Sequence, residues 1–168
     1  MATQTEAPMQ FLTYGPRRAI GVSYVGPLES AKMTALWHDQ FLPRVGEIAK
    51  PAGAAAFGFC RCVAGAPQGT MEYVAAMDAT PDAPVPAGMI AIDVPRADYA
   101  VFKVAGLGDI GATWGRAIEQ VNANPAWEPY CGPKGCQCAT HPCFELYPPD
   151  FNPDGGTLFI YIPVKKAK

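Results

Sequence analysis

The chain repeats one pattern of apolar residues in its two halves, and this repeat constrains the fold more than any other feature. Residues 18–26 form an apolar, β-branched run that ends in glycine, and residues 98–106, which begin 80 positions later, follow the same pattern. After each run, apolar residues recur at helical spacing. They are Leu36, Trp37, Phe41, Leu42 and Val45 in the first half and Ile110, Trp114, Ile118 and Val121 in the second. Ser30 and Asp109 are the predicted N-caps.

Two strands are predicted after each helix. Residues 57–63 and 70–77 follow the first helix, and residues 144–147 and 157–162 follow the second at an offset of 87. The pattern predicts an α+β fold of two βαββ units whose antiparallel sheets lie side by side, with both helices on one face. We expect a concave site at the seam and on the other face. The alternative is a chance match of apolar runs. The proline-rich residues 80–88 are predicted to be a connector without helix or interior strand.

Composition narrows the class of protein. A chain of 168 residues with 49% apolar and 17% charged residues is typical of one globular domain, taken here as residues 1–168. A net charge of −2 argues against a nucleic-acid partner, and the lysines near the C-terminus are interpreted as a solubilising tail. No apolar run is long enough to cross a bilayer, and residues 1–15 lack the features of a secretory signal. The expectation is a cytoplasmic protein with no membrane partner.

Glu145 is a single acid in an apolar and aromatic strand. Strand alternation places Tyr147 on the same face as Glu145. In the last strand we assign the aliphatic residues to the core under the helices, namely Leu158, Ile160 and Ile162. Phe159 and Tyr161 then lie on the opposite face, together with Glu145. A carboxylate among aromatic rings suits a flat, apolar cation, because ring faces and a partly desolvated acid both attract positive charge. The alternative is a glutamate that faces solvent on an open sheet.

Other aromatic residues are further candidates for ligand contacts. Tyr73 lies in a predicted strand and is a candidate to line the cleft, while Trp127 follows the second helix and is a candidate lid. Trp37 and Trp114 lie on apolar helix faces and are predicted to pack in the core.

Cysteines are concentrated in an inserted segment at about residues 128–143. Free thiols are the expectation there, and no metal is assigned. The alternatives are a disulfide and a metal site. The ligands available for such a metal site are Cys131, Cys136, Cys138, Cys143 and His141. The spacing lacks the paired Cys-x-x-Cys pattern of a zinc site, and Cys60 and Cys62 are interpreted as small buried residues.

No catalytic motif stands out. The sequence has no Gly-x-Ser-x-Gly elbow and no phosphate loop. Residues 106–111 have the glycine spacing of a dinucleotide motif, but the predicted βαββ context is wrong for it. No cofactor is predicted.

The C-terminal strands resemble a known family. Residues 144–147 followed by 159–164 are similar to the closing signature of GyrI-like small-molecule-binding domains, which also serve as effector-binding domains of AraC- and MerR-type regulators. Residues 18–27, 36–44 and 99–102 resemble further segments of that family. The resemblance implies a pseudo-twofold pair of βαββ units around a central ligand cleft. It also implies lipophilic cations as ligands, with Glu145 as the buried counter-ion and Tyr161 as an aromatic contact.

Two departures from the family refine the expectation. The predicted strands begin near residue 18, with no helix-turn-helix before them, so a stand-alone binding protein is favoured over a DNA-binding regulator. The cysteine-rich insertion, next to Glu145, is not a recognised family feature. The leading hypothesis is a binder of lipophilic, aromatic or cationic small molecules. The alternatives are a hydrolase of electrophilic toxic compounds, with Glu145 as general base, and a protein inhibitor with an acidic surface.

Overall fold

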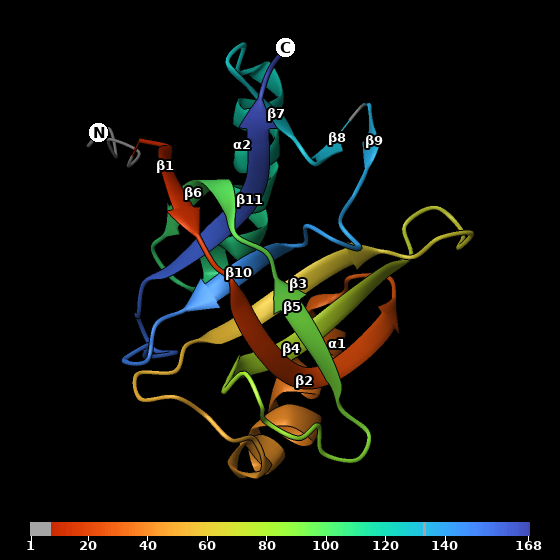
Figure 1. The fold of residues 1–168 in the computed structure, drawn as a ribbon, viewed down its shortest axis with the longest axis vertical. Helices are drawn as coiled ribbons and strands as arrows, with labels where there is room; N and C mark the ends of the chain where they lie inside the picture. The colour runs from red at the N-terminus through yellow and green to blue at the C-terminus, as the bar shows by residue number, and fades with distance from the viewer. Residues whose placement is uncertain (1–7, 133) are drawn as a thin grey trace.

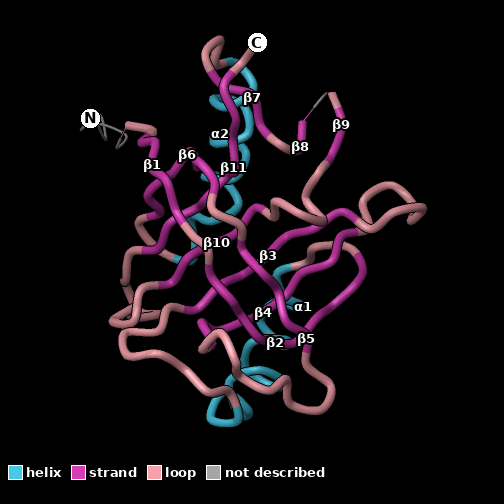
Figure 2. Tube along the Cα trace, in the orientation of Figure 1, coloured by secondary structure: helices cyan, strands magenta, loops and turns pink. Residues whose placement is uncertain are grey.

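The computed structural model describes residues 8–132 and 134–168. Residues 1–7, part of the segment predicted to carry no secretory signal, lie outside the described residues, as does Pro133 in the cysteine-rich segment. Over the described residues the chain is α+β, as predicted, with two helical segments and one large antiparallel sheet (Figures 1 and 2).

The six predicted strands are all present, and the described residues contain five more. The eleven strands are β1 (Gln10–Tyr14), β2 (Arg17–Gly26), β3 (Ala56–Cys62), β4 (Met71–Ala79), β5 (Ile90–Val94), β6 (Ala97–Val104), β7 (Trp127–Pro129), β8 (Cys131–Gly132), β9 (Gly135–Cys136), β10 (Cys143–Tyr147) and β11 (Leu158–Lys166). Residues 80–88 contain no strand or helix, which confirms the predicted connector.

Both predicted helical segments form. The first runs as α1 (Ser30–Ala35), a π-helical turn η1 (Leu36–Phe41) and a 3₁₀ turn η2 (Leu42–Glu47), and its N-cap is Glu29 rather than the predicted Ser30. The second runs as η3 (Leu107–Asp109) and α2 (Ile110–Ala123). Asp109 is the N-cap of α2, as predicted, although its side chain makes no capping hydrogen bond.

The sheet joins the two halves of the repeat into one surface. Within the described residues its order is β1-β6-β11-β10-β3-β4-β2-β5, with β7 paired to β11 and β8–β9 as a separate hairpin. The second half contributes β6-β11-β10 and the first half contributes β3-β4-β2, so the seam lies between β10 and β3. Each half also places its leading strand on the other half, because β1 pairs with β6 and β5 pairs with β2.

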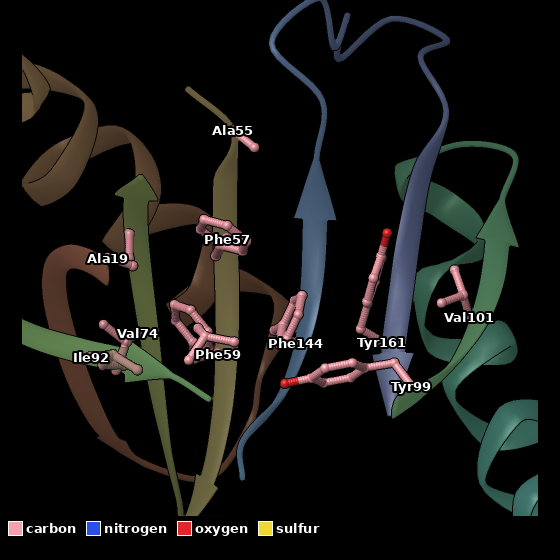
Figure 3. Packing of buried hydrophobic residues seen from close by; sticks show 12 residues of the cluster. Ala19, Ala55, Phe57, Phe59, Val74, Ile92, Tyr99, Val101, Phe144 and Tyr161 are labelled. Atoms are coloured by element: carbon pink, nitrogen blue, oxygen red, sulfur yellow. The ribbon is translucent and has the colours of Figure 1, made fainter. Parts of the chain in front are cut away.

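The two faces of this sheet carry different cores. On the helix-covered face, Ile20 and Val22 pack with η1, while Leu158 and Ile160 pack with α2, as predicted for the aliphatic set. The opposite face curls around a second core that is rich in rings, shown in Figure 3. Among its members are Phe57, Phe59, Tyr99, Phe144 and Tyr161. That face is therefore filled, and the prediction of a concave site on it is wrong.

Among the described residues, no helix has the length and apolar character needed to cross a membrane.

Candidate functional site

A cavity of about 1350 Å³ lies on the helix-covered face of the sheet. Met33 and Trp37 of the first helical segment line it on one side, and Trp114 and Ile118 of α2 line it on the other. Strands β3, β4 and β10 also contribute to its lining, so the cavity opens over the seam between the two halves. The predicted cleft at the seam is present, but it lies between the helices.

Exposed large apolar side chains gather at this cavity. Leu28, Leu42, Leu107 and Ile118 are each 44–50% exposed, and all four line the cavity. Large apolar side chains gathered at one opening are typical of an interaction surface or a ligand-binding groove. Ile118 lies on the predicted apolar face of α2, and its exposure follows because that face borders the cavity rather than closed core.

Glu145 lines the cavity from β10 and is only 6% exposed. Three side chains donate hydrogen bonds to its carboxylate. Tyr73 Oη donates to Oε2 at 2.9 Å and Tyr147 Oη donates to the same oxygen at 2.8 Å. Trp114 Nε1 donates to Oε1 at 3.1 Å. The two halves of the chain therefore hold one carboxylate together, with Tyr73 from the first half and Trp114 and Tyr147 from the second.

A second indole extends this network. Trp37 Nε1 donates to Tyr73 Oη at 3.0 Å, so the phenol that donates to Glu145 is itself oriented by a tryptophan. The Trp37 ring also meets Tyr147 edge to face at 5.3 Å, and Tyr147 meets Phe151 in the same way at 5.0 Å. The carboxylate is therefore bordered by a continuous aromatic wall that draws on both halves.

Burial is the main influence on the pKa values of the ionisable groups in this site. Desolvation raises the pKa of Glu145, and the hydrogen bonds from Trp114, Tyr147 and Tyr73 act in the opposite direction without cancelling the rise. Burial, followed by the charge of Glu145, also raises the pKa of Tyr73 and of Tyr147 far above the ordinary value, so both phenols stay protonated donors. Any group that brings positive charge to Glu145 would favour its ionised form.

Gly58 on β3 makes room for this arrangement. It is the register partner of Glu145 across the seam. A Cβ at this position would lie 2.6 Å from Glu145 Oε2 and would also collide with the Tyr73 hydroxyl. The carboxylate and the phenol therefore occupy space that only glycine leaves open.

The structure separates the predicted ligand-binding residues into two groups. Tyr147 and Tyr73 lie in the cavity and contact Glu145 directly. Phe159 and Tyr161 do not share the face of Glu145, so that prediction is wrong. Glu145 is the register partner of Ile160, whereas Tyr161 is the partner of Phe144 and stacks on its ring at 4.9 Å in the opposite core.

The wrong face assignment has a clear physical cause. The prediction placed the acid away from the aliphatic strand residues that pack under a helix. In the structure Glu145 shares their face, because the cavity interrupts the helix packing at the seam and three donors satisfy the carboxylate there.

Trp127 also lies apart from Glu145. It is part of β7, stacks on Phe11 at 5.1 Å, and lines a separate pocket of about 500 Å³. The expectation that Trp127 covers the cleft is therefore not met.

Trp37 and Trp114 are site residues that the sequence interpretation assigned to core packing. Their helical spacing correctly identified the faces that turn toward the sheet. The signal that could have distinguished them is the indole N–H, which usually needs an acceptor when it is buried. In the structure Trp114 finds its acceptor in Glu145 and Trp37 finds one in Tyr73.

Four cysteines form a cluster at the edge of the same cavity. The Sγ atoms of Cys62, Cys131, Cys136 and Cys138 all lie within 4.8 Å of one another. Of the potential metal ligands considered from the sequence, Cys143 and His141 are not in this group. The His141 ring stacks on Tyr130 at 3.9 Å, and Cys143 pairs in register with Cys60 across the seam.

The chain is similar to a family of effector-binding proteins. A family model described as Cass2, an integron-associated effector binding protein, matches residues 13–164. The transcriptional regulator BrlR of Pseudomonas aeruginosa is 36% identical over 88 residues, which are 52% of this chain and 31% of the regulator. The match therefore spans less than a third of that relative's length.

Solved structures share the fold. The structure of SAV2435 bound to tetraphenylphosphonium superimposes with a TM-score of 0.61 at 18% identity, and the match covers 95% of this chain and 94% of that one. The C-terminal domain of EcmrR gives a TM-score of 0.66 at 12% identity, covering 95% and 98% of the two chains. At these identities the likeness establishes the fold.

Proposed function

Because the chain belongs to the Cass2 family of integron-associated effector binding proteins, we propose that its cavity binds lipophilic, aromatic or cationic small molecules with Glu145 as the counter-ion. One observation carries this proposal. A carboxylate that is 6% exposed lines a large apolar cavity in which, among the described lining residues, there is no lysine or arginine.

The charge of Glu145 is the first argument. A buried carboxylate is costly unless hydrogen bonds and an opposite charge compensate it. The donors from Tyr73, Tyr147 and Trp114 are neutral, so they stabilise the ionised form without cancelling its charge. A cationic ligand in the cavity would supply the missing positive charge and would be favoured over a neutral ligand of the same shape.

The walls of the cavity are the second argument. The rings of Trp37, Trp114 and Tyr147 lie around the acid, and cation–π attraction to such faces contributes about 2 kcal/mol when water is excluded. Met33, Met71 and Met77 also line the cavity, and flexible thioether side chains adapt to ligands of different outline. A volume of about 1350 Å³ accommodates a drug-sized molecule. SAV2435, which shares the fold, takes tetraphenylphosphonium, so a phosphonium is a suitable probe.

A matched pair of probes tests the proposal. Methyltriphenylphosphonium carries a positive charge, whereas triphenylphosphine oxide has a similar outline and is neutral. In isothermal titration calorimetry at neutral pH, we expect the cation to bind at least about 30-fold more tightly, since an unpaired buried charge costs about 2 kcal/mol or more. Equal affinities for the two probes would overturn the counter-ion role.

The pH dependence gives an independent prediction. Burial raises the pKa of Glu145 in the free protein, and a bound cation favours the ionised form. Cation affinity should therefore be highest above that raised pKa and fall as the pH drops through it, by up to roughly tenfold for each pH unit. The neutral probe should bind equally well across the same range, which calorimetry at neutral and mildly acidic pH would check.

A hydrolase is the second candidate function. Burial raises the pKa of Glu145 toward the range in which a carboxylate acts as general base, and Tyr147 donates to it at 2.8 Å. In that case Glu145 would activate water for attack on an electrophile. Turnover of an epoxide or activated ester that is lost in Glu145→Gln, with binding of the intact compound retained, would support this alternative over the binder.

A further inference from the structure

The cysteine cluster joins two distant parts of the chain. Cys62 is the last residue of β3, whereas Cys131 and Cys136 face each other across the β8–β9 hairpin and Cys138 follows two residues later. Cys62 Sγ lies 2.6 Å from Cys136 Sγ and 3.7 Å from Cys131 Sγ, and Cys136 Sγ lies 3.0 Å from Cys138 Sγ. Three thiols from the inserted segment therefore converge on one thiol from the first half.

The donor set and its compactness point to a soft divalent metal. Four sulfurs with no carboxylate or imidazole among them form the ligand set typical of a structural zinc site. With a Zn–S bond of about 2.3 Å, tetrahedral sulfurs are separated by roughly 3.8 Å. The Sγ atoms of this cluster all lie within 4.8 Å of one another, so small rotamer changes suffice to reach that geometry.

The surroundings support a metal site rather than four unrelated thiols. The backbone N–H of Cys62 donates to Cys138 Sγ at 2.7 Å, a contact that stabilises a thiolate ligand and fixes its orientation. Cys138 is 3% exposed, while Cys62 and Cys136 are exposed, which leaves a path for the ion. The strands β8 and β9 have only two residues each, so the hairpin needs a further link to the body of the protein.

We propose that Cys62, Cys131, Cys136 and Cys138 bind one Zn²⁺ ion in a structural tetrathiolate site that ties the inserted segment to β3. Binding replaces four S–H bonds with four Zn–S bonds and releases four protons, which leaves the site with two net negative charges. Cys62, Cys131 and Cys138 also line the Glu145 cavity, so the ion would fix one end of its wall.

Metal analysis of the purified full chain tests the site directly. With no metal-binding tag and with reductant present, we expect about one zinc per chain by mass spectrometry of the metal content. Cys62→Ser and Cys138→Ser should each weaken zinc binding by at least about 100-fold. The matched controls are Cys143→Ser, Cys60→Ser and His141→Gln, which should all retain the ion. Absence of stoichiometric zinc from the wild-type protein, or equal loss in the controls, would overturn the proposal.

Two further measurements keep the test decisive if a serine variant does not fold. Cobalt substitution of the wild-type protein should give the visible absorption of a tetrahedral tetrathiolate complex. Alkylation followed by peptide mass spectrometry should find these four thiols protected with zinc and reactive after chelation. Stoichiometric iron, or a disulfide that resists reductant, would contradict a zinc site. Glu145→Gln should retain zinc, so failure of the metal site and failure of the ligand site are distinguishable.

Discussion

Glu145→Gln is expected to weaken binding of methyltriphenylphosphonium by at least about 30-fold and to leave binding of triphenylphosphine oxide unchanged. Glutamine keeps the size of the side chain, removes its charge, and replaces the oxygen that accepts from Tyr73 and Tyr147 with an NH₂ donor. Its carbonyl can still accept from Trp114 Nε1, and its NH₂ group can donate to the phenol oxygen of Tyr147. Calorimetry with both probes on the wild-type and variant proteins separates the effect of the charge, which acts on the cation alone, from that of the altered hydrogen bonds, which acts on both probes.

The same substitution should remove a pH-dependent cost to the stability of the protein without ligand. Burial raises the pKa of Glu145 in the folded state above its value in the unfolded chain, so ionisation at neutral pH costs folding free energy. That cost is present above the folded pKa and disappears as the pH falls below the unfolded value. Thermal denaturation should therefore show the Tm of the wild-type protein rising relative to that of the variant as the pH falls through this range.

A matched control distinguishes the effect of changing Glu145 from the general effect of removing one negative charge from the protein. Glu119 is exposed on α2, and Glu119→Gln should change neither the affinity for the cation nor the Tm in this way. If Glu145→Gln lowers the affinities for both probes equally, Glu145 contributes to the shape of the cavity and the counter-ion proposal fails.

Gly58→Ala is expected to damage the site and the fold together. The added Cβ would lie 2.6 Å from Glu145 Oε2 and would also collide with the Tyr73 hydroxyl, at a position paired with strands on both sides. Overpacking of this kind costs about 1–3 kcal/mol. In a chain of this size each kcal/mol lowers Tm by roughly 2–4 °C. Cation affinity should fall as well, because the carboxylate and its phenol donor must both move.

Two comparisons test whether the steric clash of the new Cβ causes the loss of stability in Gly58→Ala. Gly115→Ala on α2 adds a Cβ that meets nothing within 4 Å beyond its two chain neighbours and the backbone of its own helix, and it should be stabilising by about 0.5–1 kcal/mol through helix propensity. Combining Gly58→Ala with Tyr73→Phe removes the hydroxyl that the new Cβ would meet, and it should recover part of the lost stability. A Tm for Gly58→Ala that equals that of the wild-type protein would contradict this account of the seam.

The internal repeat was sufficient to predict the architecture. The six strands of the two βαββ units and both helical segments are where the spacing placed them, because each unit carries a full set of apolar signals along the chain. Strands β1 and β5 were not predicted. Each is only five residues long and pairs with the opposite half, so its position depends on contacts that a local pattern does not contain.

The site was predictable in part. Glu145 stood out because a lone acid in an apolar strand needs partners, and Tyr147 follows from strand alternation. Alternation cannot decide which face of one strand matches which face of the next, because that depends on the pairing register. Glu145 pairs with Ile160 rather than with Tyr161, so the predicted contacts Phe159 and Tyr161 lie on the other face of the sheet. The donors Trp37 and Trp114 come from the two helical segments. The periodicity of the sequence predicts these segments but does not predict where they lie over the seam.

The cysteine cluster, too, could be predicted from the sequence only in part. Three of its members lie close together in the sequence, but the fourth, Cys62, is about 70 positions away. It reaches the group because β3 and β10 meet at the seam. No spacing rule for short metal-binding motifs would have selected it.

The two repeats carry different residues at the centre of the seam. Gly58 and Glu145 are equivalent positions of the two repeats, and they are each other's register partners, so the pseudo-twofold axis runs through this one pair. In a dimer of identical units, symmetry would place the same residue at both positions. Two glutamates would repel each other and compete for one space, and two glycines would leave no charge. A single chain whose halves have diverged can put one carboxylate on the axis, which a dimer of identical units cannot do.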